Sequence, residues 1–358
     1  MIPKWKIARE ARRVREQFKA FVMKPVYWLH QRNFDRQRDA HIEVGEGDLV
    51  LGANVVVLLV YQPKGLSQAT FHTLQHLQSE GFSAFVVLNS AVSEAEYDRL
   101  KAKCALIMKR PNFGYDFGGY RDAIIHLTTQ AYALNSITCI NDSIWFPVFK
   151  ECDHLSRMLG IAGNFVGYSY SKGFKKRKNA HVQSYLFMFK DRAFLETADF
   201  RKYWANLKVS NSRYFTIRNS EMRMTAYFQS RNYKIGWLFS ADDMRQYYTT
   251  CADEDVVAAV SYLDAIGHHS AALFKDLSLH DVSALRQRLI EGLESGKLSR
   301  NVIGSEPGML FRGIGFAAMK KSNSHNYKMQ RQISVDRAIC QQFAPQVEQE
   351  ILAMNPRP

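Results

Sequence analysis

Hydrophobic positions divide the chain from residue 54 onward into short apolar runs separated by amphipathic stretches. The runs are rich in β-branched residues, which is typical of strands buried on both faces of a parallel sheet. The stretch 67–80 has helical spacing and ends at Gly81, and Ser93 opens a second helix with acidic residues in its first turn. We therefore expect βαβ units. The expected strands are Val55–Val60, Ala84–Leu88, Ala105–Met108 and Ile137–Ile140.

Polar residues follow each of these strands. Because the carboxyl ends of parallel strands lie at one edge of a sheet, these residues should converge in one ligand-binding crevice. The segment 112–119 holds three glycines, so its backbone N–H groups can meet a phosphate at a helix start, or it can form a tight turn against the sheet. It matches neither a Walker A nor a GxGxxG motif. The segments that follow the strands are Tyr61–Gln62, Asn89–Ser90, Arg110–Gly119 and Asn141–Ser143.

Asp142 stands between Asn141 and Ser143, directly behind an apolar strand. A carboxylate with short polar neighbours suits a hard cation and its phosphates, whereas a single Asp at a strand end can also be a cap or turn residue. Its expected position beside the glycine-rich segment favours the cation site.

Residues 1–40 carry eleven Lys and Arg against four Asp and Glu, a net charge of +7 out of +14 for the whole chain. Apolar residues recur there at helical spacing from Ile7 to Val22, and Pro25 should end the pattern. The segment is predicted to be a basic amphipathic helix. It can lie in the interface of an anionic membrane, where Trp28 would fit, or dock on its own domain with a solvated basic face.

The composition, with 46% hydrophobic and 23% charged residues, indicates a folded globular chain. Its excess of cations favours an anionic partner, which can be a nucleic acid, an acidic lipid or a phosphorylated substrate. The five cysteines are scattered and form no CxxC pair, so a zinc site and a disulfide framework are not expected and a reducing compartment is favoured. No signal peptide and no apolar run of about 20 residues is recognisable, so we expect a cytoplasmic location.

Three segments together resemble the rhamnan-synthesis F family of bacterial glycosyltransferases. They are Asn112–Arg121, then Asn141–Ser143 with Pro147, and then His181–Tyr185. The resemblance extends over residues 50–330. It implies an α/β, GT-A-like, Rossmann-type fold with a mostly parallel sheet, a nucleotide-sugar donor, and a part in building rhamnose-containing polysaccharide or lipopolysaccharide O-antigen chains.

The resemblance also implies roles for the strand-end residues. In GT-A enzymes a DxD motif after the fourth strand holds a divalent metal on the donor diphosphate, and Asn141–Ser143 stands there with one carboxylate instead of two. Asp142 is the expected ligand of Mg²⁺ or Mn²⁺. The expected donor-binding residues are Tyr61, Asn89, Arg110, Asn112, Gly114, Asp116, Gly118, Gly119 and Asn141.

The segment Asn219–Thr225 is similar to the acidic helix start of inverting GT-A enzymes. Glu221 is therefore the expected general base that deprotonates the acceptor hydroxyl, although Ser220 and Glu221 can also be a helix cap and a first-turn residue. Asp242 and Asp243 are reserve candidates for the base. The expected acceptor-binding residues, which can also simply begin a strand, are His181, Gln183 and Ser184.

The remaining pattern adds two strands, near 164–168 and 186–189, and then mostly helices beyond residue 255. Between the two strands, the basic loop Lys172–Lys178 can attract an anionic ligand or be merely solvated. The predicted domains are a basic N-terminal arm at 1–45, a GT-A-like glycosyltransferase domain at 50–250, and a mostly helical C-terminal segment at 251–358 packed on it.

The sequence thus predicts a glycosyltransferase at the inner face of the plasma membrane that transfers L-rhamnose or another sugar by direct displacement. Its expected partners are a nucleotide-sugar donor, a glycan or lipid-linked glycan acceptor, and an anionic membrane surface bound through the arm, without nucleic acid. The first alternative is a non-catalytic glycan-assembly scaffold with the same fold, because the metal motif has only one carboxylate. The second is a basic nucleic-acid-binding protein with an α/β core.

Overall fold

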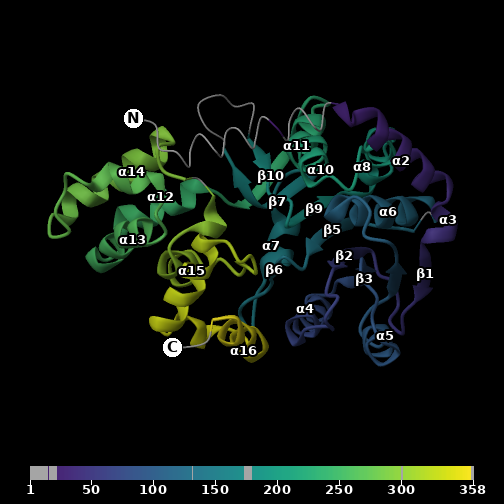
Figure 1. The fold of residues 1–358 in the computed structure, drawn as a ribbon, viewed down its shortest axis with the longest axis horizontal. Helices are drawn as coiled ribbons and strands as arrows, with labels where there is room; N and C mark the ends of the chain where they lie inside the picture. Colours follow the sequence, from purple (N-terminus) through teal and green to yellow (C-terminus); the bar gives the residue numbers. More distant parts are fainter. Residues whose placement is uncertain (1–14, 16–21, 131, 173–179, 300, 356–358) are drawn as a thin grey trace.

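The computed structural model describes residue 15 and residues 22–130, 132–172, 180–299 and 301–355. Its centre is a nine-stranded, mostly parallel sheet, which confirms the predicted α/β fold (Figure 1). The strands are β1 (Glu43–Glu46), β2 (Asn54–Val60), β3 (Ser83–Leu88), β4 (Leu106–Lys109), β5 (Ser136–Asn141), β7 (Phe165–Ser171), β8 (His181–Val182), β9 (Leu186–Lys190) and β10 (Ile235–Phe239).

The strand order is β1-β4-β3-β2-β5-β9-β7-β10, with β8 paired to β7. Strands β4, β3, β2 and β5 run parallel, so β2, β3 and β5 end at one edge of the sheet. Strand β9 runs antiparallel to both of its neighbours, and β1 runs antiparallel to β4. The four predicted strands are therefore present as parallel neighbours, and the antiparallel strand β9 divides the parallel part into two groups.

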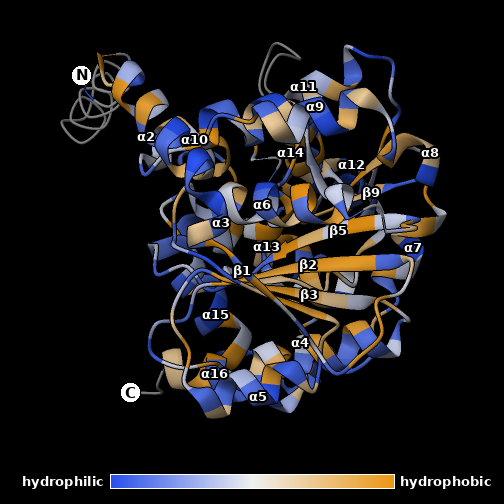
Figure 2. Cartoon of the chain, turned by 90° about the vertical axis from the view of Figure 1, so that its right-hand side faces the viewer, coloured by the Kyte–Doolittle hydropathy of each residue, from blue (hydrophilic) through white to orange (hydrophobic). Residues whose placement is uncertain are grey.

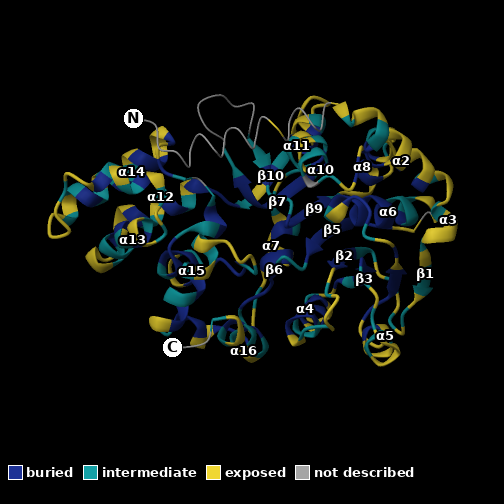
Figure 3. Cartoon of the chain, in the orientation of Figure 1, coloured by how far each residue is buried: buried dark blue, intermediate teal, exposed yellow. Residues whose placement is uncertain are grey.

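The sheet separates two hydrophobic cores. Alternate residues of β2 enter different cores, with Val55 and Val57 in one and Val56 and Leu58 in the other. Figure 2 shows the apolar strands between helices on both faces, and Figure 3 shows the buried strands at the centre and exposed residues on the surrounding helices. One face is covered by α6 (Tyr115–Thr129), α8 (Arg192–Leu195), α9 (Ala198–Asn206) and α11 (Glu221–Gln229), and the other by α4 (Gln68–Ser79), α5 (Glu94–Lys101) and α7 (His154–Gly160).

One predicted helix boundary is confirmed. The Ser93 hydroxyl and the Glu96 carboxylate form a reciprocal capping box at the start of α5. Pro25 lies in the first turn of α2 (Lys24–Arg36), a helix that the pattern does not predict, where its missing N–H has no intrahelical acceptor to lose. The predicted amphipathic helix before it falls in 1–14 and 16–21, outside the described residues.

The C-terminal part of the chain joins the second core. Its helices are α12 (Ala241–Thr250), α13 (Asp253–Ala265), α14 (Val282–Ser295), α15 (His325–Asp336) and α16 (Pro345–Met354). Two further helices, α3 (Arg38–His41) and α10 (Arg213–Asn219), come earlier in the chain and do not belong to this part. Helix α16 lies beside α4 (Figure 1). The pattern predicts helices here and misses strand β11 (Met319–Lys320), which pairs antiparallel with β6 (Ile144–Trp145).

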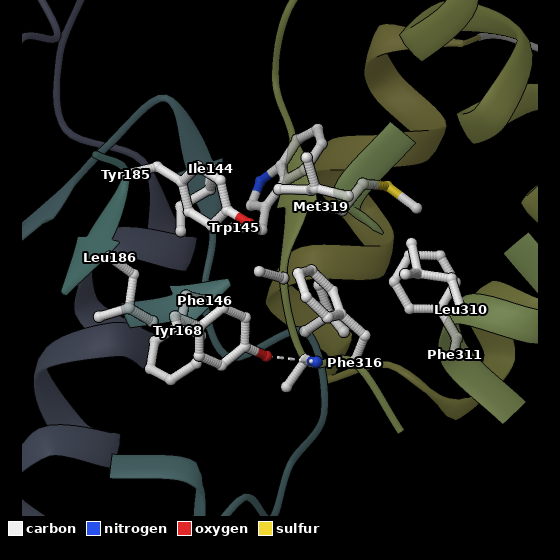
Figure 4. Packing of buried hydrophobic residues seen from close by; sticks show 14 of the residues in the cluster. Ile144, Trp145, Phe146, Tyr168, Tyr185, Leu186, Leu310, Phe311, Phe316 and Met319 are labelled. Atoms are coloured by element: carbon white, nitrogen blue, oxygen red, sulfur yellow. Dashed lines mark hydrogen bonds between the residues drawn. The ribbon is translucent and has the colours of Figure 1, made fainter. Parts of the chain in front are cut away.

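Aromatic packing fixes this junction. The Tyr168 hydroxyl accepts a hydrogen bond from the backbone N–H of Ala317 at 2.7 Å, and Phe316 packs on the Tyr168 ring with centroids 4.8 Å apart (Figure 4). Trp145 and Met319 face each other across the β6–β11 pair and are both buried. The C-terminal part is thereby held against the carboxyl end of β5. None of the helices in the described ranges has both the length and the apolar character of a bilayer-crossing segment.

Candidate active site

A cleft of about 1020 Å³ opens at the carboxyl ends of β2, β3 and β5. This is the edge at which the sequence predicts a ligand crevice. The predicted site residues that line the cleft come from six separate segments of the chain. They are Tyr61, Asn89, Asn112, Asp116, Asn141, Asp142, Gln183, Ser184 and Glu221.

Hydrogen bonds tie the floor of the cleft to the start of α6. Asn141, the last residue of β5, donates from Nδ2 to Oδ2 of Asp116 at 2.8 Å. Its Oδ1 accepts from the hydroxyl of Ser143 at 2.5 Å and from the backbone N–H of Ser143 at 3.2 Å. Because Asn141 is buried and has both ends of its amide engaged, it fixes the positions of Asp116 and Ser143 at the cleft.

Asp142 is held in the cleft by the segment that follows β2. Its Oδ2 accepts the backbone N–H of Tyr61 at 2.8 Å. Burial raises the pKa of Asp142, and this N–H and the positive charge of Lys321 oppose the rise. The ionised carboxylate is therefore less well solvated than in water and gains from a cation that enters the cleft.

Asp142 fits a metal ion that is shared with a bound diphosphate. Mg²⁺ is commonly held by one or two carboxylates together with substrate phosphates and water. Among the residues described by the structure, no group of three or more His, Cys, Asp or Glu side chains could hold an ion alone. The remaining ligands of a divalent ion at Asp142 would include diphosphate oxygens and water.

The three glycines of the segment 112–119 shape the cleft without lining it. Gly114 has φ of +78° and is the N-cap of α6. A Cβ on Gly119 would lie 2.2 Å from Cδ1 of Leu59, and a Cβ on Gly118 would lie 2.0 Å from the carbonyl oxygen of Phe113. The structure thus places Gly114, Gly118 and Gly119 in the close packing of α6 on β2 and on its own loop, outside the cleft lining.

Arg110 also lies beneath the cleft and not in it. Its side chain is fully buried and donates to Oδ2 of Asp122 at 2.9 Å, to Oδ1 of Asn89 at 2.8 Å, and to the carbonyl of Phe113 at 2.6 Å. Asn89 in turn donates to Oδ1 of Asn112 at 3.2 Å. Arg110 therefore orients two residues that line the cleft and has no surface there itself.

Glu221 begins α11 and faces the cleft. The side chain of Ser220 does not cap this helix, because its hydroxyl donates to the carbonyl of Thr216 at 2.5 Å. His181 Nε2 lies 3.8 Å from Oε1 of Glu221, and Nε2 of Gln183 lies 3.2 Å from the same ring nitrogen. The predicted base and two of the predicted acceptor residues therefore form one cluster, in which His181 lies behind the cleft surface.

The reserve candidates for the base lie outside the cleft lining. Asp243 accepts the backbone N–H of Ser240 at 2.7 Å and completes the capping box of α12. Asp242, in the same first turn, pairs with Lys172. The structure therefore gives Asp243 a helix-capping position.

The C-terminal part supplies one wall of the cleft, which the sequence pattern does not indicate. The only local sequence feature of this wall is a lysine doublet after a short apolar run. The β6–β11 pair that brings the doublet to the cleft joins segments that are far apart in the sequence, so a local pattern does not predict it. The lining residues from this part are Lys320, Lys321, Ser322, Tyr327 and Glu350. Gln62, Tyr115, Phe117 and Ser143 also line the cleft and belong to the predicted strand-end segments. The other lining residues, which were not predicted, are Pro63, Lys64, Gly65, Ser67, Tyr185, Thr216 and Ile217.

The chain matches a known protein family. The model of rhamnan synthesis protein F matches residues 84–289, more than half of the chain. The matched range includes the strand ends after β3 and β5 and the start of α11, and it ends before β11.

Curated proteins with similar sequences have no assigned activity in their names. The chain is 29% identical, over an alignment of 365 positions, to the uncharacterized protein y4gN of Sinorhizobium fredii, covering 98% of this chain and 92% of that protein. It is 27% identical over 180 positions to virulence protein VirA of Vibrio anguillarum, covering 46% of this chain and 52% of VirA.

Two solved structures are similar to parts of the fold at low TM-scores. A putative nucleotide-diphospho-sugar transferase from Desulfovibrio desulfuricans G20 has a TM-score of 0.30 at 8% identity, covering 68% of this chain and 99% of that chain. The mannosyltransferase PcManGT from Pyrobaculum calidifontis, in complex with GDP-Man and Mn²⁺, has a TM-score of 0.35 at 9% identity, covering 94% and 97%. With TM-scores this low, neither the architecture nor the ligands of these two proteins are assigned to this chain.

The position of Arg110 predicts a large effect on stability. Arg110→Met leaves the buried carboxylate of Asp122 without its closest partner, although Arg38 also reaches Asp122 at 3.5 Å. We expect the free energy of unfolding, measured by urea denaturation, to fall by about 3 kcal/mol, the lower end of the cost of breaking a buried ion pair. Lys109→Met, on the exposed neighbour in the chain, should change it by less than about 1 kcal/mol. Equal stability of the two variants would contradict the supporting role of Arg110.

Proposed function

This chain belongs to the rhamnan synthesis protein F family, and on that basis and on the cleft we propose that it is a nucleotide-sugar-dependent glycosyltransferase. The observation that carries the proposal is the convergence of Asn112, Asp116, Asn141, Asp142 and Glu221 in one cleft at the ends of parallel strands. This edge is where open α/β sheets bind nucleotides.

The donor occupies the part of the cleft around the ends of β2, β3 and β5. Tyr61 and Asn89 are neighbours of the base or ribose, and Asn112, Asp116 and Asn141 shape the floor. A divalent ion at Asp142, when bound, offsets negative charge on the diphosphate leaving group. The family's name, rhamnan synthesis, supports L-rhamnose as the sugar. The proposal adds a dTDP-linked donor and a cell-surface polysaccharide or O-antigen chain as the acceptor.

Glu221 acts as the general base of an inverting displacement. It lies at the cleft surface, where its carboxylate can take the proton of an acceptor hydroxyl as that oxygen attacks the sugar. Gln183 and Ser184 line the cleft and are placed to bind acceptor hydroxyls, and His181 supports Glu221 from behind.

A nucleotide-sugar screen tests the proposal. Thermal unfolding is followed with dTDP-rhamnose, UDP-glucose and GDP-mannose, each with Mn²⁺ or with EDTA. A ligand at about 100 times its Kd adds about 2.7 kcal/mol to native-state stability, which is a readily measured shift. The screen is followed by a donor-hydrolysis assay, because a non-catalytic scaffold with the same fold would bind a donor without turning it over.

Replacement of the base predicts a loss of turnover with little loss of binding. Glu221→Gln keeps the size and hydrogen-bonding capacity of the side chain and removes the basic carboxylate. Because general-base catalysis contributes about 10²–10⁴-fold, kcat should fall at least tenfold while the KM for donor changes much less. Steady-state kinetics with the donor found in the screen measures both.

Arg223→Gln, two residues further along α11, is the matched control and should retain normal turnover. If Glu221→Gln is as active as this control, the base is another group. A loss of activity in Asp242→Asn or Asp243→Asn instead would move the base to α12.

The raised pKa of Asp142 gives a prediction for stability and binding together. The native state binds the proton of the Asp142 carboxyl group more tightly than the unfolded chain does. Protonation of Asp142 therefore stabilises the native state at low pH, and this stabilisation is lost as the pH rises through the raised pKa. Asp142→Asn removes that loss, and its amide oxygen can still accept the Tyr61 N–H. At neutral pH the variant should therefore be at least as stable as the natural protein by urea denaturation, and it should lose the donor affinity that Mn²⁺ adds. A donor affinity unchanged in the presence of Mn²⁺ would remove Asp142 from the site.

The basic arm anchors the protein to an anionic membrane surface at the inner face of the plasma membrane. Helix α2 lies within the arm and exposes Trp28 and Leu29, and Val22 before the helix is also exposed. Apolar side chains beside a cluster of cations are the features that bind anionic membrane interfaces.

Removal of residues 1–21 tests the anchor and leaves α2 complete. The shortened protein should no longer sediment with liposomes that contain phosphatidylglycerol, because each basic residue near such a surface contributes about 1 kcal/mol. Donor binding should be unchanged, since the cleft is lined by later residues. Liposomes of phosphatidylcholine are the control, and continued sedimentation of the shortened protein with anionic liposomes would place the anchor elsewhere.

A further inference from the structure

The β6–β11 pair brings two lysines to the Asn-Asp-Ser motif from the other end of the chain. Lys320 pairs with Ile144 in the antiparallel register, and the backbone N–H of Lys321 donates to the carbonyl of Ser143 at 2.9 Å. Both lysines line the cleft. The motif at the end of β5 therefore faces two cations that lie outside the region matched by the family.

A buried arginine holds this segment in place. The side chain of Arg331, on α15, is fully buried, and its Nη1 donates to the carbonyl oxygens of Lys320 at 3.1 Å and of Ser322 at 2.9 Å. Its Nε donates to Oδ1 of Asn355 at 2.9 Å. The backbone that carries the two lysines is thus fixed without help from their own side chains.

Lys320 reaches the floor of the cleft. Its Nζ donates to the hydroxyl of Ser143 at 3.1 Å and lies 4.7 Å from the centre of the Tyr185 ring. Ser143 bonds to Asn141, and Asn141 bonds to Asp116, so one chain of hydrogen bonds crosses the floor from this ammonium group to α6. The ammonium group is therefore positioned beside the residues that would face a bound diphosphate.

Lys321 lies on the other side of the motif, close to Asp142. Its Nζ is 3.9 Å from Oε2 of Glu350, and the charges of both Glu350 and Asp142 oppose the lowering of its pKa by burial. Glu350 has other partners, since it accepts the backbone N–H of Ala69 at 2.9 Å and the indole N–H of Trp145 at 2.7 Å. Glu350 is thus held in place independently of Lys321.

The charges of the cleft make these lysines important for an anionic ligand. The described side chains that line it include four carboxylates, from Asp116, Asp142, Glu221 and Glu350, and three ammonium groups, from Lys64, Lys320 and Lys321. A diphosphate that entered would meet net negative charge unless it contacted the cations directly. Two of the three cations stand together at the motif that would face the leaving group.

We propose that Lys320 and Lys321 bind the diphosphate of the nucleotide-sugar donor directly, from a strand at the far end of the chain. This inference rests on the proposed function and adds a contact that does not depend on a metal ion. Ammonium groups at hydrogen-bond distance from diphosphate oxygens form charge-assisted hydrogen bonds, which are about twice as strong as neutral ones. The same groups stabilise negative charge as it develops on the leaving group.

Calorimetric titration of the full chain with dTDP, UDP and GDP tests the proposal. The binding constant of the best diphosphate is measured in EDTA and in Mn²⁺ for the natural protein and for Lys320→Met and Lys321→Met. Each variant should bind it at least tenfold more weakly in both conditions. The binding of the corresponding nucleoside, which has no phosphate, should change less than twofold, and this separates a phosphate contact from a general distortion of the cleft.

Lys328→Met is the matched control, because Lys328 is an exposed lysine of the neighbouring helix α15. Lys320→Arg and Lys321→Arg keep the charge and should retain affinity within about threefold, and circular dichroism checks that every variant is folded. If folded Met variants bind the diphosphate as tightly as the control, or lose nucleoside and diphosphate affinity equally, the lysines do not hold the diphosphate. If the natural protein binds no nucleoside diphosphate in any condition, the proposed function itself fails.

Discussion

The parallel pairing of β2 with β3 and β5 is the constraint on which the rest of the structure depends. Six residues of β2 are aligned with β3 and six with β5. Tyr61, Asn89 and Asn141 therefore emerge at the same edge although they are far apart in the sequence. The apolar side chains of β2 enter both cores, so the strands have little freedom to slip. Because this sheet edge is fixed, polar residues can line one cleft although the strands before them are apolar and buried.

The parts of the site that follow the sheet could be predicted from the sequence, because they depend on local patterns. An apolar run followed by Asn-Asp-Ser or by a glycine-rich turn indicates the end of a strand, and the cleft lies at these strand ends. Arg110 and Gly119 could not be assigned in this way. Whether a polar or small residue at a strand end faces a ligand or supports the packing depends on Asp122 and Leu59, whose positions come from tertiary structure.

The C-terminal wall could not be predicted for a different reason. Strand β11 has two residues, too few for a periodic pattern, and its partner β6 has two as well. What holds Lys320 and Lys321 at the cleft is the buried guanidinium of Arg331 and the aromatic packing around Tyr168, both of which are long-range interactions. The helical pattern beyond residue 255 predicts the helices of this region, and it gives no sign that part of the region lines the cleft.

The anchoring of Glu350 has a consequence for the order of events during synthesis. Its carboxylate joins the start of α4 to the indole of Trp145, so it bonds to segments made near the beginning and the middle of the chain. The sheet edge can assemble as soon as β5 and β9 leave the ribosome, because chains fold progressively from the N-terminal side. The wall opposite Asp142 forms only after α16 has been made. Until then, the bonds of Glu350 to α4 and Trp145 are missing and the cleft lacks this wall.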